Sequence, residues 1–270
     1  MRTVAMPPSK ISIPAAVVRF LRINFTAKEH MKKLFFFLGC AIAFVTVSAQ
    51  TKLINDPNAE VRKLSGSFHA IEVSNAIDLY LSQGDEEAVA VSASEKRDIY
   101  RVITEVDNGV LKIKFQNTGK IIWRLKDRKF KAYVAFKSID RLSASGASNV
   151  YIEGTLNSNN LAVHMSGASD LKGNLKSDDL KIDLSGASDA LISGSANNVT
   201  IDASGASDVK AFDFVTENCT ARASGASDIK ITVNKELNVH ASGASDIHYK
   251  GTATIKDLHS SGASSVSKRD

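Results

Sequence analysis

The sequence is poor in cysteine, which limits both its covalent cross-links and its metal chemistry. Only Cys40 and Cys219 occur in 270 residues, and Cys40 lies in a leader segment described below. A lone Cys219 excludes an internal disulfide and a cysteine-ligated metal site. Because Cys219 falls on an apolar position of an alternating run, we expect a buried and inert thiol.

Long apolar runs are also missing, and the one short run belongs to a leader. Residues 34–47 are mostly apolar, but a membrane span needs roughly 18 such residues. Met31-Lys32-Lys33 precedes this run and Val47-Ser48-Ala49 follows it, which is the pattern of a secretory signal peptide. We expect residues 1–49 to be an over-extended start plus a cleaved signal peptide, with Met31 as the initiator. Lipid attachment at Cys40 is disfavoured, because only a few apolar residues precede it.

The mature chain lacks an excess of charge of either sign. Residues 1–49 carry seven Lys/Arg and one Glu, which leaves 27 basic and 28 acidic residues (34 − 7 and 29 − 1). The pI of about 9.1 therefore belongs to the leader and gives no reason to expect a nucleic-acid partner. We expect an exported protein in the periplasm, on the outer-membrane surface or outside the cell, without a transmembrane span in the mature chain.

What the sequence has in abundance is one tetrapeptide, Ser-Gly-Ala-Ser. It occurs seven times at intervals of 18 to 21 residues, around Gly146, Gly167, Gly186, Gly205, Gly225, Gly243 and Gly262. A period near 20 residues indicates a stacked array of small units, each too small to bury its own apolar face.

The residues before each tetrapeptide alternate between apolar and polar side chains, as in Leu180/Ile182/Leu184. Period two is typical of a strand with one buried face. With a second strand after the motif and a third mid-coil, the sequence predicts an all-β, right-handed parallel β-helix (β-solenoid). We expect about three short strands per ~19–20-residue coil. Residues 50–62 would be a linker, 63–140 irregular N-terminal coils or a cap, and 141–270 the regular solenoid.

The tetrapeptide itself is predicted to be a structural corner that stacks on its own copies. Glycine permits backbone angles closed to other residues. Alanine and serine are small enough to pack where coils crowd, and Ser and Asp side chains can bond nearby backbone N–H groups. This interpretation requires no ligand.

Three features together resemble a known family. They are the leader, the stretch IEVSNAIDLYLSQGDEEAVAV at residues 71–91, and the serial Ser-Gly-Ala-Ser-Asp corners. The chain resembles the auto-transporter adhesin head domain family, also called the head GIN domain, over roughly residues 64–266. The resemblance implies a right-handed β-helix at the envelope or cell surface and an adhesive role.

An aspartate follows five of the corners, and these five would form a column if the coils stack in register. The residues are Asp170, Asp189, Asp208, Asp228 and Asp246. Calcium, which prefers oxygen ligands, would relieve the repulsion between stacked carboxylates. The alternative, which we favour, is that each aspartate accepts hydrogen bonds within its corner. We therefore expect no cofactor, with calcium as the open alternative.

The segment KIIWRLKDRKFK interleaves basic residues with the single tryptophan. Its candidate ligand-binding residues are Lys120, Trp123, Arg124, Lys126, Arg128, Lys129 and Lys131. Basic and aromatic side chains together can bind acidic glycans, phosphates or a membrane surface. The alternative is a strand that buries Phe130, Ala132, Val134 and Phe136 while its lysines protect a sheet edge.

No catalytic residues are predicted. A second column, His164, Asp183, Asp202, Arg222, His240 and His259, reads as a mixed-charge outer ladder, and the G-x-S-x-G nucleophile motif is absent. The sequence favours an exported, non-enzymatic β-helix that binds glycans or envelope components, with an oligomeric state that it does not indicate. The alternatives are a polysaccharide lyase or hydrolase and a purely structural envelope protein.

Overall fold

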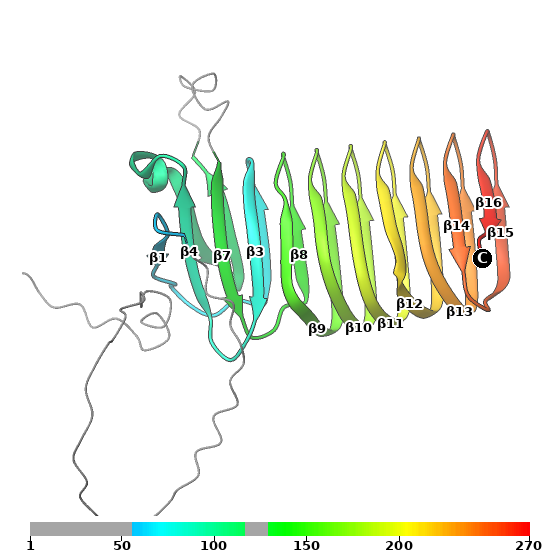
Figure 1. The fold of residues 1–270 in the computed structure, drawn as a ribbon, viewed down its shortest axis with the longest axis horizontal. Helices are drawn as coiled ribbons and strands as arrows, with labels where there is room; N and C mark the ends of the chain where they lie inside the picture. Colours follow the sequence, from blue (N-terminus) through cyan, green and yellow to red (C-terminus); the bar gives the residue numbers. More distant parts are fainter. Residues whose placement is uncertain (1–55, 117–128) are drawn as a thin grey trace, which may run out of the picture. The chain divides into compact units, whose positions relative to one another are not determined.

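The computed structural model describes residues 56–116 and 129–270. These residues form a 16-stranded sheet that is wound into a β-solenoid of about seven turns, with parallel bridges about 19 residues apart. Figure 1 shows the coils side by side along the rod. The predicted fold class is therefore confirmed.

The regular part, which we call the array, consists of parallel strands that pair with the strand one coil earlier. Each pairing joins equivalent positions, as in Asp170↔Asp189 and Leu184↔Ala203. The strands of the array are β8 (Arg141–Ala144), β9 (Val150–Met165), β10 (Asp170–Leu184), β11 (Asp189–Ala203), β12 (Asp208–Ala223), β13 (Asp228–Ala241), β14 (Asp246–Lys250), β15 (Thr254–Ser260) and β16 (Ser265–Lys268).

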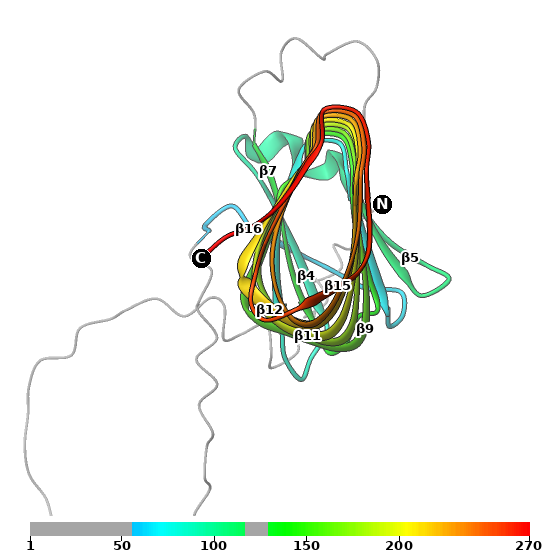
Figure 2. The same cartoon turned by 90° about the vertical axis from the view of Figure 1, so that its right-hand side faces the viewer.

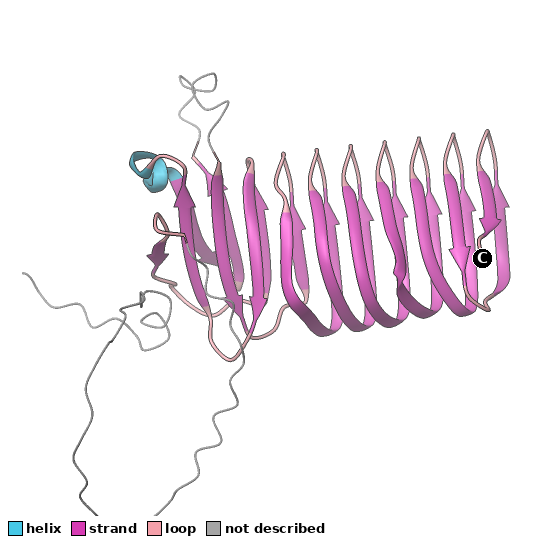
Figure 3. Ribbon diagram, in the orientation of Figure 1, coloured by secondary structure: helices cyan, strands magenta, loops and turns pink. Residues whose placement is uncertain are grey.

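Each of the complete coils β9 to β13 is one strand of 14 to 16 residues that bends, rather than three separate short strands. The coil has a narrow end at the Ser-Gly-Ala-Ser corner and a broad, rounded opposite end (Figure 2). Only the corners interrupt the strands of the complete coils (Figure 3). Register shifts mark the bend, for example between Leu191 and Gly194. Such bulges let the backbone ladder continue around a curve, so the expected strand breaks do not form.

The core fills the narrow space between the two sides of each coil. Its inward positions alternate with outward polar ones, as the sequence pattern requires, and include Leu180, Ile182 and Leu184, all at most 2% exposed. The mid-coil apolar residues Leu156 and Leu175 are fully buried. The core therefore runs continuously along the rod rather than forming one central cluster.

The N-terminal strands are less regular. The first coil consists of β2 (Ala70–Ser74) and β3 (Ile77–Gln83), which pair in parallel with β8 and β9. On the other side of this coil lies what we call the cap: β1 (Glu60–Arg62), β4 (Ala88–Ala93), the 3-10 helix η1 (Lys96–Arg101), β5 (Val102–Asp107), β6 (Val110–Phe115) and β7 (Phe130–Phe136).

Apart from β1, the strands of the cap follow the first coil in the chain. Strands β6 and β7 pair in parallel with β2 and β3, whereas β5 pairs antiparallel with β6 and β4 pairs antiparallel with β7. The first coil therefore lies between the cap and the array. Antiparallel pairing ends the repeat at this side and covers the edge that an unpaired coil would present.

No helix in residues 56–116 or 129–270 has the length and apolar character that a membrane span requires.

Candidate functional site

A shallow groove runs along the rod beside the corners. It has a volume of about 700 Å³ and is lined from six successive coils. One wall is the outer ladder, which we define as His164, Asp183, Asp202, Arg222, His240 and His259. The other wall carries the first serines of the corners, Ser166, Ser185, Ser204, Ser224, Ser242 and Ser261. Because coils repeat every ~4.8 Å, the groove offers the same pair of polar positions at regular steps.

The outer ladder is in register, as the sequence predicted, and its charges pair between neighbouring coils. The Nδ1 atom of His164 lies 2.8 Å from Oδ2 of Asp183, and Nη1 of Arg222 lies 3.4 Å from Oδ1 of Asp202. Lys181 adds a second contact to Asp183 at 3.1 Å. Each described carboxylate of this ladder therefore faces a basic side chain, and the groove presents charges of both signs rather than a field of one sign.

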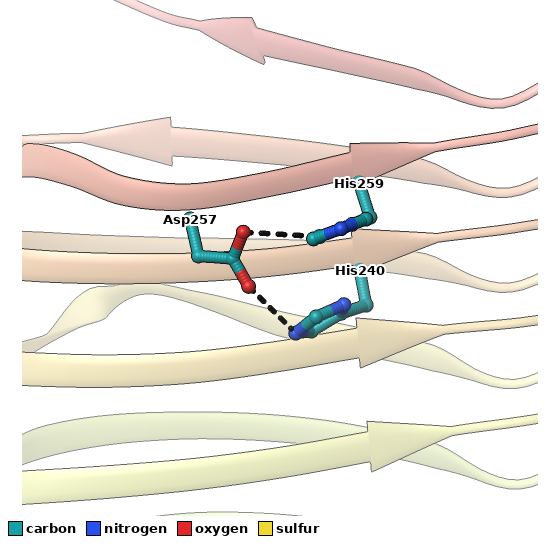
Figure 4. A group of neighbouring side chains, drawn as sticks. All are labelled: His240, Asp257 and His259. Carbon is teal, nitrogen blue, oxygen red and sulfur yellow. Dashed lines mark ion pairs between the residues drawn. The ribbon is translucent and has the colours of Figure 1, made fainter.

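The ladder ends in a cluster of three side chains, His240, Asp257 and His259 (Figure 4). The two imidazole rings stack with centroids 5.1 Å apart and planes 14° apart. Oδ1 of Asp257 lies 3.0 Å from Nδ1 of His259, and Oδ2 lies 3.5 Å from Nε2 of His240. In the part of the chain that the structure describes, this is the only group of three His, Cys, Asp or Glu residues whose ligand atoms converge within 4.8 Å.

Both histidines lie on the ladder as the sequence predicted, whereas Asp257 was not among the predicted site residues. The available signal was the spacing Asp257-x-His259, because side chains two residues apart on a strand share a face.

The corners are held by a ladder of buried serines. The second serine of each corner from Ser148 to Ser245 is fully buried. Its hydroxyl donates to the carbonyl three residues earlier, as from Ser188 to Ser185 at 3.0 Å. The same oxygen accepts the backbone N–H of the preceding corner, as from Ser169 to Ser188 at 3.4 Å. These serines are therefore structural, and the groove exposes only the first serine of each corner.

The corner glycines are required for two separate reasons. Gly205 has a φ of +80°, and a Cβ added there would lie 2.4 Å from the carbonyl oxygen of Gly186. The series begins at Asn75, a non-glycine residue with a φ of +67°, on which Gly146 stacks. The sequence Ser74-Asn75-Ala76 is thus a degenerate corner of the first coil.

The aspartate column lies on the other side of the corner, on what we call the post-corner face. Its members are register partners from Asp170 to Asp246. The backbone N–H of Asp208 donates to Asp189, and Lys210 contacts both carboxylates at 3.2 and 3.3 Å. These hydrogen bonds raise the pKa of Lys210. Internal partners thus satisfy part of the column, and calcium there stays the untested alternative to the predicted hydrogen bonding within the corners.

The post-corner face also carries a tyrosine ladder that the sequence analysis missed. Tyr80 stacks between Tyr133 and Tyr151, with ring centroids 5.2 and 5.0 Å apart. Burial and the nearby Asp78 and Asp170 raise the pKa of Tyr151. The signal was one tyrosine at an outward position of each of three strands. Because the faces of the tyrosine rings stack on one another, the ladder presents mainly ring edges and hydroxyl groups to solvent.

Most of the predicted basic segment, from Lys120 to Arg128, lies outside the described residues. Lys129 is exposed, and Lys131 lies on β7 beside Asp78. The inward residues of β7 are buried as the strand alternative predicted. However, the expectation that its lysines protect an edge is wrong, because β7 pairs with β3 on one side and with β4 on the other.

Cys219 lies in the core at 2% exposure, and burial raises the pKa of its thiol to about 12. The residue is therefore a small core side chain rather than a nucleophile at neutral pH.

Solved structures share this fold. A protein described as a "putative adhesin" from Bacteroides fragilis NCTC 9343 aligns with a TM-score of 0.70 at 19% identity, covering 78% of this chain and 96% of its own. A "putative adhesin" from Parabacteroides distasonis ATCC 8503 aligns with a TM-score of 0.62 at 18% identity, covering 78% and 96%. A "putative lipid binding protein" from the same organism has a TM-score of 0.55 at 18% identity, covering 80% and 98%.

No curated protein sequence matches the chain. A family model described as "Putative auto-transporter adhesin, head GIN domain" matches residues 67–253, which include the first coil, most of the cap and six of the seven corners. The chain therefore belongs to the head GIN domain family of adhesin-like β-solenoids.

Proposed function

We propose that this protein is an exported, non-enzymatic β-solenoid that binds glycans or other envelope components through the groove beside its corners. The observation that carries the proposal is the groove itself, which runs along six coils and carries one ladder residue and one corner serine at each step. Its serine hydroxyls and charged side chains can donate and accept hydrogen bonds at every step. Such a surface suits an extended, repetitive polymer better than a small molecule.

Export is supported by the leader pattern of residues 31–49 and by membership of an adhesin-like family. A location in the periplasm, on the outer membrane or outside the cell would place the groove within reach of polysaccharides.

A binding role is favoured over catalysis because of how the groove is built. Enzymatic hydrolysis of a glycoside needs two carboxyl groups arranged around one bond, and a lyase needs a base and a charge-stabilising group gathered at one point. Here Asp183 and Asp202 belong to a regular ladder and are each engaged with a cation. A ladder residue and a corner serine recur in each of the six coils, so neither of these two carboxylates is set apart as a reaction centre.

The test is a panel of acidic and neutral polysaccharides, with binding measured by glycan array and biolayer interferometry and cleavage measured by release of reducing ends. The double variant Asp202→Ala/Arg222→Ala removes one anion and one cation from the middle of the groove and leaves the net charge unchanged. We expect it to weaken binding at least about tenfold, which corresponds to ~1.4 kcal/mol.

The matched control is Lys230→Ala, which lies on the post-corner face and should bind like the unchanged protein. Polysaccharide cleavage would overturn the proposal in favour of an enzyme. Equal losses in the double variant and in the control would remove the groove as the binding surface, and no binding across the panel would favour a structural envelope protein.

A further inference from the structure

The cluster at the end of the outer ladder has the composition and spacing of a metal site. His240 lies on β13 and His259 on β15, and the two are register partners in parallel strands. Asp257 lies two residues before His259 on the same strand, so its side chain shares the outward face. The register of the coils therefore fixes all three side chains on one small patch (Figure 4).

We propose that His240, Asp257 and His259 bind a divalent transition-metal ion of the zinc class. Zinc binds imidazole nitrogen and carboxylate oxygen at ~2.0–2.2 Å, so two ligand atoms on one tetrahedral ion lie about 3.3 Å apart. The two nitrogen-to-oxygen distances in the cluster are 3.0 and 3.5 Å. These two contacts have the spacing that a shared ion requires, and all three ligand atoms lie within 4.8 Å of one another. Because an imidazole binds a metal ion in its ring plane, the two stacked rings would rotate out of their stack to share the ion.

The donor set selects the class of ion. Two imidazoles and one carboxylate suit Zn²⁺, Cu²⁺ or Ni²⁺, whereas Ca²⁺ and Mg²⁺ prefer oxygen ligands alone. In the structure the carboxylate contacts one nitrogen of each ring. Binding of a metal ion at these atoms requires neutral imidazole nitrogens and an ionised carboxylate, as is general for histidine and carboxylate ligands.

The surroundings leave the patch open to an ion from solvent. The side chains of His240, Asp257 and His259 are 39, 45 and 70% exposed. The nearest cation on the ladder, Arg222, is directed to Asp202 on the coil before, and Lys256 contacts Glu236. Because His240 and His259 also line the groove, a bound ion would lie at one end of it with coordination positions left for water or an anionic group.

The same ladder contains a natural control. His164 and Asp183 form a contact of 2.8 Å, but the register partners of His164 are Ser143 and Asp183, so no second histidine stacks on its ring. A His–Asp pair without a second imidazole offers only two donors. We therefore expect the two ends of one ladder to differ in metal affinity.

The test uses the tag-free protein and zinc chloride as the probe. Isothermal titration calorimetry should show one saturable Zn²⁺ site per chain, and histidine ring signals of His240 and His259 should shift together in NMR spectra. His259→Ala and Asp257→Asn should each weaken Zn²⁺ binding at least about tenfold, since even changes outside the ligand shell cost 10–100-fold. His164→Ala should leave the affinity unchanged, and excess Ca²⁺ should not compete.

The variants change exposed side chains, so their melting curves without metal should overlay that of the unchanged protein, which separates lost binding from lost fold. The proposal is overturned if no saturable Zn²⁺ binding occurs, or if His164→Ala weakens binding as much as His259→Ala. It is equally overturned if Asp257→Asn and His259→Ala both bind Zn²⁺ with unchanged affinity, because the ion would then lie elsewhere.

Discussion

The cap and the array bury their apolar surface in different ways. The cap uses large aromatic side chains, including Phe115 and Phe130 with ring centroids 4.4 Å apart, and pairs several strands antiparallel. In the array, the inward residue before each corner changes in size from coil to coil while the strands stay in register: Met165 and Leu184 are followed by Ala203, Ala223 and Ala241. A repeating coil must keep the same backbone path at every level, whereas a cap is built once and can be filled individually. The array therefore depends on a repeated backbone, and the cap depends on the fit of individual large side chains.

The largest loss of stability is expected when a large side chain is removed from the core of the cap. Phe136 on β7 is fully buried, and Phe136→Ala should lower the free energy of unfolding by about 3–5 kcal/mol through lost burial and the cavity left behind. Urea unfolding followed by circular dichroism measures this loss. The neighbouring exposed Lys137 provides the control, since Lys137→Ala should change stability little; similar losses in both variants would contradict the role assigned to Phe136.

A slightly smaller loss of stability is expected when one methyl group is added at a corner glycine of the array. Gly205→Ala places a side chain at φ +80° and drives its Cβ toward the carbonyl of Gly186. Strain and overpacking together should cost about 3 kcal/mol. Gly84, where a Cβ would meet nothing within 4 Å, is the matched control. If Gly205→Ala melts at the same temperature as Gly84→Ala, the corners do not stack as described.

The buried serine ladder should contribute less per residue. Ser207→Ala removes the acceptor of the Ser188 backbone N–H and leaves that buried donor unsatisfied, at a cost of about 1–3 kcal/mol. Ser207→Thr would keep the hydroxyl but add a methyl group, so a loss of stability in this variant would report overpacking rather than a lost hydrogen bond. The exposed Ser195 is the control, and we expect Ser195→Ala to unfold at nearly the same denaturant concentration as the unchanged protein. Equal midpoints for Ser207→Ala and Ser195→Ala would argue against the ladder.

The smallest expected effect is a loss of stability at alkaline pH that is caused by the buried thiol of Cys219. The thiol of Cys219 has its pKa raised from 9.0 to about 12 by burial, so the unfolded chain loses this proton at lower pH than the folded one. The stability contribution is complete below pH 9 and is lost as the pH rises toward 12. At pH 10, one unit above the unfolded pKa, the loss should be about 1.4 kcal/mol.

Cys219→Ala should remove this part of the alkaline slope when thermal unfolding is compared between pH 8 and pH 10. A thiol reagent at pH 8 should label Cys219 only after denaturation. Rapid labelling of the folded protein, or an unchanged slope in Cys219→Ala, would contradict a buried neutral thiol.

The array was predictable from the sequence because its corner motif and its alternating apolar runs recur from coil to coil. Ser-Gly-Ala-Ser appears where the chain turns, and period-two runs such as Val199/Ile201/Ala203 appear where it is extended. The pairing order of the cap was not predictable. Strands β5 and β6 form a hairpin around Asn108-Gly109, but nothing local to β7 shows that it pairs with β3 and β4. Such pairing depends on contacts between distant segments that occur only once.

The candidate site was predictable in part for the same reason. The outer ladder follows from the repeat, so the stacking of His240 on His259 could be foreseen. Asp257 was not assigned to the cluster, although it lies two residues before His259 on the same strand and therefore shares its face. The tyrosine ladder crosses from the cap to the array through Tyr80, and its order depends on the unpredicted pairing of β3 with β7.

The central claim is that successive corners stack in register. The most direct measurement is a pulsed electron-electron resonance distance between nitroxides at Ser185→Cys and Ser261→Cys, in a chain whose Cys40 and Cys219 are replaced by alanine. Both serines are exposed and occupy equivalent corner positions four coils apart. Corners stacked in register should give a narrow distribution centred near ~19 Å, four steps of ~4.8 Å, broadened only by the label tethers. A broad distribution, or a much longer mean distance, would contradict the stacked solenoid.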